Sequence, residues 1–173
     1  MNRFMKASRV GFDLKQHIPW QVKIVAKIIL ARLPLSYGFW EWLSLFKHGE
    51  MERPEYAFQV FCRHFERVQF PRKTGGFVGL ELGPGDSLFS ALIAKALGAS
   101  KVYLVDVGAF ARTDLTSYRK MASYLSEQGL RGAGFGNCRT TEEFLMVCSA
   151  DYLTAGLASL NELPTAAVDF IWS

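Results

Sequence analysis

The sequence predicts an α/β protein in which a helical N-terminal lobe precedes a parallel sheet. Two short apolar runs with β-branched residues, FVGLEL (77–82) and KVYLVDV (101–107), are typical of buried strands. The segment between them, SLFSALIAKALG (87–98), has the length and pattern of a helix. Strand, turn, helix and second strand make one βαβ unit, which implies parallel strands joined by a right-handed crossover.

The composition favours one globular protein without a membrane span. The chain has 173 residues, of which 50% are hydrophobic and 21% charged, so it has enough apolar surface for a core and is unlike a disordered chain. The longest apolar run, IVAKIIL, is interrupted by Lys27 and is too short to span a bilayer. The N-terminus lacks the apolar stretch of a secretory signal, which favours a cytoplasmic protein.

Charge and aromatic residues divide the chain near residue 73. Residues 1–73 hold 13 Lys and Arg against 6 Asp and Glu, and 13 of the 24 aromatic residues. Residues 74–173 hold 7 basic residues against 10 acidic ones. The PRKTGG stretch at 71–76 is suited to a linker. We therefore expect a basic helical lobe over 1–73 and an α/β lobe over 74–173.

Three helices are expected in the first lobe, over residues 19–33, 37–47 and 54–68. A proline opens the first and the third, at a position where the missing N–H costs nothing. In the third helix, phenylalanines recur at helical spacing, which favours core packing over ligand stacking. These are Phe58, Phe61 and Phe65.

The second lobe continues with further helices and strands. Asp114 is expected to cap a helix over 115–129, and Gly98 to end the helix before it. Thr140 and Glu143 form a predicted capping box for the helix TEEFLMVC. Two more strands are expected, ADYL (150–153) and AVDFIW (167–172).

The turn ELGPGDS, at residues 81–87, follows the first strand of this lobe. Gly83 and Gly85 have no Cβ and would let a ligand come close to the backbone. A dinucleotide fingerprint would have a third glycine where this chain has Leu88. The acids Glu81 and Asp86 would repel a pyrophosphate but attract a cation. The turn therefore favours a ligand that is cationic and lacks phosphate.

The second strand ends in Asp106, at 21 positions beyond Gly85. An acid at this place can accept hydrogen bonds from the two hydroxyl groups of a ribose. A nucleoside with positive charge and no phosphate satisfies both the turn and this acid. S-adenosylmethionine, which joins an adenosine to a sulfonium and an α-amino group, fits the description.

The segments VGLELGPGDS, KVYLVDVG and VDFIWS resemble motifs one, two and four of the class I S-adenosylmethionine-dependent methyltransferases. The resemblance covers roughly residues 77–173 and implies a Rossmann-like parallel sheet. It implies that Glu81 lies near the amino end of the methionine moiety and that Gly83 and Gly85 line its approach. It also implies that Asp106 binds the ribose and Val107 flanks the adenine.

Asp86 in the turn and Ala158 beyond the third strand complete the expected cofactor-binding residues. After the third strand, many members of the family have a polar side chain that binds the adenine amino group. At this position the chain offers Leu157, Ala158 and Ser159. The resemblance implies a complete domain with a seven-stranded sheet, whereas about four strands are expected here. We therefore expect a fragment whose fourth strand is an apolar edge, covered in the native protein by further residues or by a partner.

No catalytic residue is predicted, because methyl transfer from a sulfonium depends mainly on alignment of the acceptor. The histidines, His17, His48 and His64, fit surface or capping positions better than a general base. Cys62, Cys138 and Cys148 lack metal-site spacing, so we expect structural thiols and no metal; Cys138 in a glycine-rich stretch remains a candidate nucleophile.

The methyl acceptor is expected to be a small molecule, a sugar or a lipid-linked molecule, given the basic first lobe, whose helices loosely resemble those of bacterial methyltransferases. Lys23 and Lys27 make a basic stripe that suits either a solvated face or contact with a membrane surface. Nucleic acid is disfavoured because the basic residues form no tract. An NAD-dependent oxidoreductase and a non-catalytic scaffold that binds a partner stay as alternatives, and the oligomeric state is open.

Overall fold

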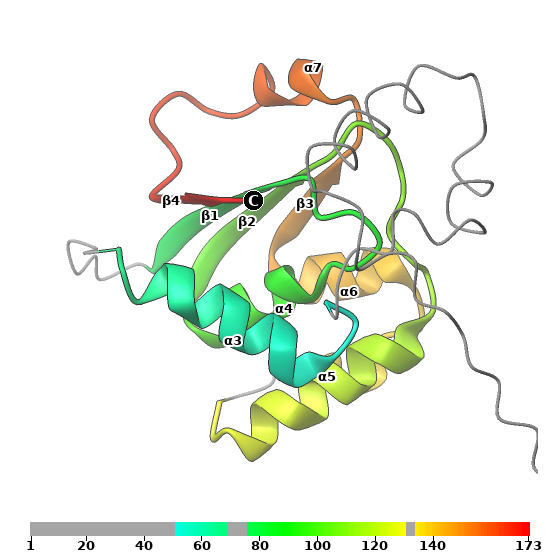
Figure 1. Cartoon of the computed structure of the whole chain (residues 1–173). Coiled ribbons are helices and arrows are strands. Elements are labelled where there is room, and N and C mark those ends of the chain that lie inside the picture. The colour runs from blue at the N-terminus through cyan, green and yellow to red at the C-terminus, as the bar shows by residue number, and fades with distance from the viewer. Residues whose placement is uncertain (1–50, 69–75, 131–133) are drawn as a thin grey trace, which may run out of the picture. The chain divides into compact units, whose positions relative to one another are not determined.

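The computed structural model describes residues 51–68, 76–130 and 134–173, which belong to one compact unit, His48–Ser173 (Figure 1). The helices expected over 19–33 and 37–47 lie outside the described residues. Within the described ranges, no helix has the length and hydropathy needed to cross a bilayer.

The sheet consists of four strands in the order β3-β2-β1-β4, and all neighbouring pairs are parallel. This confirms the prediction of an α/β fold with about four parallel strands. Because the chain moves outward from β1 to β3 and then returns to the other side of β1, the winding reverses beside β1. Ligands of open α/β sheets bind beyond the carboxyl ends of the strands near such a reversal. The strands are β1 (Phe77–Leu82), β2 (Ala99–Val105), β3 (Ala150–Leu153) and β4 (Phe170–Trp172).

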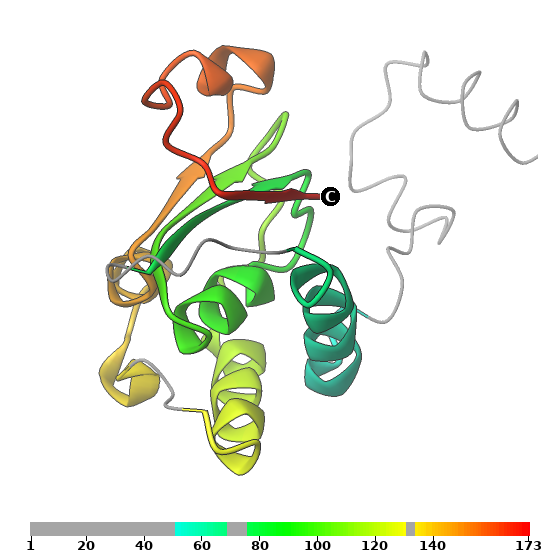
Figure 2. The same cartoon turned by 90° about the vertical axis from the view of Figure 1, so that its left-hand side faces the viewer.

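Helices α3 to α6 lie on one face of the sheet, and the segment with the short helix α7 returns to β4 on the other side (Figures 1 and 2). Helix α4 joins β1 to β2, and α5 and α6 lie between β2 and β3 in the chain. The helices are α3 (Pro54–Phe65), α4 (Phe89–Ala96), α5 (Leu115–Glu127), α6 (Thr141–Cys148) and α7 (Leu157–Leu160), with a 3-10 turn at Phe135–Asn137.

The core lies between the sheet and these helices. Phe61 of α3 packs edge-on against Trp172 and Phe170 of β4, with ring centroids 5.2 and 5.7 Å apart. The ring centroids of Phe65 and of Phe77 in β1 lie 4.9 Å apart. These contacts confirm the expected core role of the α3 phenylalanines. They also place α3 in the same compact unit as the sheet, although the division expected at residue 73 assigns it to the first lobe.

Helix ends follow the capping residues in the sequence, with one shift. The Asp114 side chain accepts the Thr116 N–H at 3.0 Å, as expected for an N-cap. Thr140 Oγ1 accepts the Glu143 N–H at 3.2 Å. The Glu143 carboxylate accepts the N–H of Arg139 at 2.7 Å, one residue before the position that a capping box requires.

Strand β4 is shorter than the sequence predicts, beginning at Phe170 and not at residue 167. Ala166 has φ of 57°, which is incompatible with an extended strand. Asp169 then exchanges two hydrogen bonds with Val78: its N–H donates to the Val78 carbonyl at 2.9 Å, and its carboxylate accepts the Val78 N–H at 3.0 Å. The side chain of Asp169 thus replaces a backbone acceptor, and the regular ladder starts one residue later.

Candidate functional site at the carboxyl edge of the sheet

The turn between β1 and α4 carries both predicted glycines in the left-handed region, with φ of 73° at Gly83 and 66° at Gly85. The Gly83 N–H donates to the carbonyl of Val105 at 2.8 Å, which ties the turn to the end of β2. A Cβ built on either glycine would meet no atom within 4 Å. The space beside the turn is therefore open to a ligand that approaches the backbone.

Asp106 is held at the end of β2 by three parts of the chain. Its carboxylate accepts the N–H of Gly85 at 2.9 Å and that of Val107 at 2.7 Å. Its backbone N–H donates to Leu153 of β3 at 2.9 Å, and its carbonyl accepts the Gly156 N–H at 2.8 Å. Asp106 is only 7% exposed, and its carboxylate has lone-pair sites beyond the two that these N–H groups use. The structure thus brings Gly85 and Asp106 together, as the sequence predicts.

Glu81 lies near the end of β1 and is only 5% exposed. Its carboxyl group accepts a hydrogen bond from the Ser90 hydroxyl of α4. Burial raises the pKa of Glu81 to about 8; Ser90 partly offsets this, and the negative charge of Asp106 adds to it. The carboxyl group is therefore mostly neutral at pH 7. The site thus carries less negative charge than the two acids Glu81 and Asp106 would give if both were ionised.

The Asp86 carboxylate is engaged by a cation of the chain itself. Arg112 lies 3.8 Å from it and forms a shorter ion pair, 2.7 Å, with Glu52 ahead of α3. The Arg112 N–H also donates to the Asp86 carbonyl at 3.0 Å. The sequence places Asp86 among the cofactor-binding residues, but here it joins the glycine turn to the segment that follows β2.

Two apolar side chains flank the same edge and are largely exposed. Val107 is 79% exposed and Leu157 is 83% exposed. Gly156, which directly precedes Leu157, has φ of 61°, and a Cβ there would lie 3.5 Å from Val107. Ala158, the predicted residue after the third strand, is an exposed position of α7. Leu157, directly before Ala158, is therefore a further apolar side chain exposed at this edge.

Three further residues shape this edge and were missed from the sequence: Ser90, Arg112 and Tyr152. Their partners lie outside any short motif: Glu81 is 9 positions from Ser90, and the Gly108 carbonyl is 44 positions from Tyr152. No local motif marks such residues, because the fold alone creates their contacts.

The predicted histidine and cysteine roles can be placed in part. His17 and His48 lie outside the described residues, and His64 is exposed on α3 with its ring centroid 6.1 Å from that of Trp172. Cys138 and Cys148 are buried, and burial raises the pKa of both thiols, that of Cys148 to about 12. Both therefore stay protonated, which supports structural thiols and opposes a nucleophilic Cys138.

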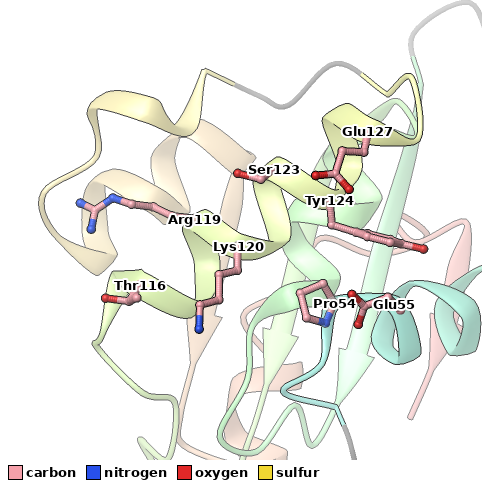
Figure 3. Close-up of a pocket in the computed structure, with 8 residues that line it drawn as sticks. All are labelled: Pro54, Glu55, Thr116, Arg119, Lys120, Ser123, Tyr124 and Glu127. Carbon is pink, nitrogen blue, oxygen red and sulfur yellow. The ribbon is translucent and has the colours of Figure 1, made fainter.

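An open pocket of about 510 Å³ lies elsewhere, between α3 and α5 (Figure 3). Figure 3 shows the Tyr124 ring directed toward Pro54 and Glu55, with Lys120 on the same side of α5. Acidic and basic side chains both contribute to it, and none of the predicted site residues does. We therefore assign the candidate site to the carboxyl edge of the sheet. The pocket is lined by Pro54, Glu55, Thr116, Arg119, Lys120, Ser123, Tyr124 and Glu127.

Among the residues that the structure describes, no group of three or more His, Cys, Asp or Glu side chains is arranged to hold a metal ion. Comparisons with family models, with characterised proteins and with solved structures found no match to the chain. The functional interpretation therefore rests on the geometry of this edge.

Proposed function

We propose that the chain binds S-adenosylmethionine at the carboxyl edge of its sheet and belongs to a methyltransferase. One observation carries this proposal: Asp106, directly after β2, accepts the N–H of Gly85 in a glycine turn that is open to a ligand, and Glu81 lies near the end of β1, where a bound cation would draw its neutral carboxyl group toward ionisation. Two acids beside an open backbone suit a cationic nucleoside. S-adenosylmethionine supplies an activated methyl group on its sulfonium when bound.

The remaining side chains of the edge fit the parts of this cofactor. The free lone pairs of Asp106 suit the two ribose hydroxyls. Val107 and Leu157, both exposed, would bury apolar area against the adenine ring. Glu81, near the end of β1, would lie close to the methionine amino group, where a cation would draw its carboxyl group toward ionisation.

A pyrophosphate-containing cofactor such as NAD fits this edge less well. Dinucleotide folds bind the pyrophosphate with free N–H groups at the start of the helix that follows β1. Here the Leu88 N–H donates to the Tyr118 hydroxyl at 3.4 Å, and the Phe89 N–H to the Ser87 hydroxyl at 3.4 Å. Leu88 is also fully buried, so its position serves the core.

The reaction that we propose is methyl transfer to a small-molecule, sugar or lipid-linked acceptor. Such a transfer needs the acceptor atom in line with the methyl group, and alignment alone supplies much of the rate. No general base is assigned, since His64 makes no contact with the residues of this edge that we describe. The acceptor class rests on the basic charge of residues 1–73.

Titration calorimetry with S-adenosylhomocysteine tests the proposal directly. We expect the full chain to bind it and to bind NAD at least tenfold more weakly. Asp106→Asn keeps one oxygen acceptor but removes the charge, so affinity should fall by about tenfold or more, as for loss of a charged hydrogen bond. A folded chain that binds neither ligand would exclude the proposed cofactor and favour the non-catalytic scaffold.

A further inference from the structure

The hydroxyl of Tyr152, on β3, holds three backbone groups of the segment after β2. It accepts the N–H of Phe110 at 3.0 Å and that of Ala111 at 3.3 Å, and it donates to the Gly108 carbonyl at 3.0 Å. Burial raises the pKa of Tyr152, so the hydroxyl keeps the proton that it donates. One side chain thus binds three backbone groups of a loop that lacks regular secondary structure.

The segment held in this way, residues 107–113, is called here the post-β2 segment, and it is also tied to the glycine turn. The Arg112 N–H donates to the Asp86 carbonyl at 3.0 Å. The hydroxyl of Tyr118 donates to the Arg112 carbonyl at 3.1 Å and accepts the Leu88 N–H at 3.4 Å. Movement of the post-β2 segment would therefore move the turn as well.

One side chain also packs within the segment. A Cβ on Gly108 would come within 2.7 Å of the Phe110 ring, so the ring lies directly against the glycine backbone. Val107 begins the segment and presents its side chain to solvent at the edge of the sheet. The direction in which the Val107 side chain points thus depends on how residues 108–111 are held.

We propose that Tyr152 is a positioning residue for cofactor binding, which fixes the post-β2 segment so that Asp106 and Val107 keep the places suited to ribose and adenine. The inference rests on the proposed function, and in it Tyr152 touches no cofactor atom. Its hydroxyl acts through Gly108, Phe110 and Ala111. Preorganisation of this kind contributes affinity because the loop is ordered before the ligand arrives.

The test compares Tyr152→Phe with Tyr124→Phe in the full chain. Tyr124 lies on α5, and its hydroxyl forms no hydrogen bond in the described part of the chain. Calorimetry should show S-adenosylhomocysteine affinity at least fivefold lower for Tyr152→Phe, because a phenyl ring makes none of the three hydrogen bonds of the Tyr152 hydroxyl. Tyr124→Phe should bind as the unsubstituted chain does.

Hydrogen exchange supplies a readout that a purely structural role would not reproduce. The amides of Phe110 and Ala111, which donate to the Tyr152 hydroxyl, should lose protection in Tyr152→Phe and regain it with saturating S-adenosylhomocysteine, whereas α4 amides stay protected throughout. Equal affinity of the two variants, with or without loss of protection, would overturn the inference. If Tyr152→Phe does not fold, exchange in the unsubstituted chain decides: Phe110 and Ala111 amides that exchange freely before ligand is added would overturn the inference, because the segment would then not be ordered in advance.

The failures of the two proposals are distinguishable. If the unsubstituted chain does not bind S-adenosylhomocysteine, the proposed function fails and this inference fails with it. If the unsubstituted chain binds and Tyr152→Phe binds equally well, the proposed function stands and only the role of Tyr152 is rejected.

Discussion

The carboxyl group of Glu81 ionises less readily than an ordinary glutamate because water barely reaches it. Its pKa of about 8 in the folded chain compares with 4.5 for an unburied side chain. The folded state therefore binds more protons than the unfolded state between these two values. Stability from this group is fully present below pH 4.5 and is lost as the pH rises through 8.

Glu81→Gln should remove this pH dependence, because an amide stays neutral and still offers an oxygen to Ser90. Relative to the variant, the unsubstituted chain should lose about 1.4 kcal/mol of unfolding free energy per pH unit across the window. Urea unfolding at pH 5, 6, 7 and 8 measures the difference. Parallel pH profiles for the two chains would show that Glu81 does not titrate in this range.

The same substitution should act in the opposite direction on cofactor affinity. A neutral amide cannot balance the charge of the methionine amino group, so Glu81→Gln should bind S-adenosylhomocysteine more weakly while being more stable at pH 8. A residue that lowers stability and raises affinity is typical of a functional site.

The glycine turn is the element on which the candidate site depends most. Gly83→Ala should cost about 1 kcal/mol of stability, because alanine is disfavoured in the left-handed region. It should also abolish most cofactor affinity, because the added methyl group would occupy the open space beside the turn. Thermal unfolding and calorimetry on the same sample give both values.

Gly129 provides a matched control for this substitution. It follows α5 with φ of 75°, close to the 73° of Gly83, and a Cβ there also meets nothing within 4 Å. Gly129→Ala should therefore lose similar stability and keep its affinity. Equal affinities for both alanine variants would mean that no ligand approaches the turn.

Elements were predictable from the sequence where the local signals were strong. Strand β1 has the predicted bounds, and Asp114 caps α5 as expected, because a run of apolar residues and a capping side chain act within a few positions. Helix α7 was not predicted, since its four residues are too few to show a periodicity. The start of β4 was wrong because the Asp169 side chain takes the place of a backbone acceptor for the Val78 N–H, so the regular ladder begins only at Phe170.

The residues of the candidate site were predictable from the sequence, but their contacts and charges were not. The sequence identified Gly83, Gly85 and Asp106, whose spacing reflects the βαβ unit, and the structure brings Gly85 and Asp106 into contact. It did not reveal that burial keeps the Glu81 carboxyl group mostly neutral at pH 7 or that Arg112 lies 3.8 Å from the Asp86 carboxylate. Both depend on neighbours that only the folded chain provides.

At the scale of the whole molecule, one side of the sheet carries exposed apolar surface at its edge. Within the described ranges β4 pairs with β1 alone, and Ile171 is 60% exposed between the buried Phe170 and Trp172. An apolar strand at a sheet edge favours association between chains.

Ile171→Lys should reduce that association with little change in unfolding free energy, within about 0.5 kcal/mol for an exposed position. Light scattering over a range of protein concentrations measures it. Met146→Lys, on the exposed side of α6 where Met146 is 71% exposed, is the control and should scatter as the unsubstituted chain does. If both lysine variants reduce scattering equally, total charge and not the β4 edge controls association.

The bonds around Asp106 also determine when the candidate site forms. Its carboxylate needs Gly85, 21 positions earlier, and its backbone needs Leu153 and Gly156, close to 50 positions later. Contacts over such separations form late, because the intervening chain must first close into loops at a cost in entropy. During synthesis, a chain whose β3 has not yet left the ribosome thus contains the glycine turn but lacks the residues that hold Asp106 in place. The cofactor that we propose could then bind only after the third strand has joined the sheet.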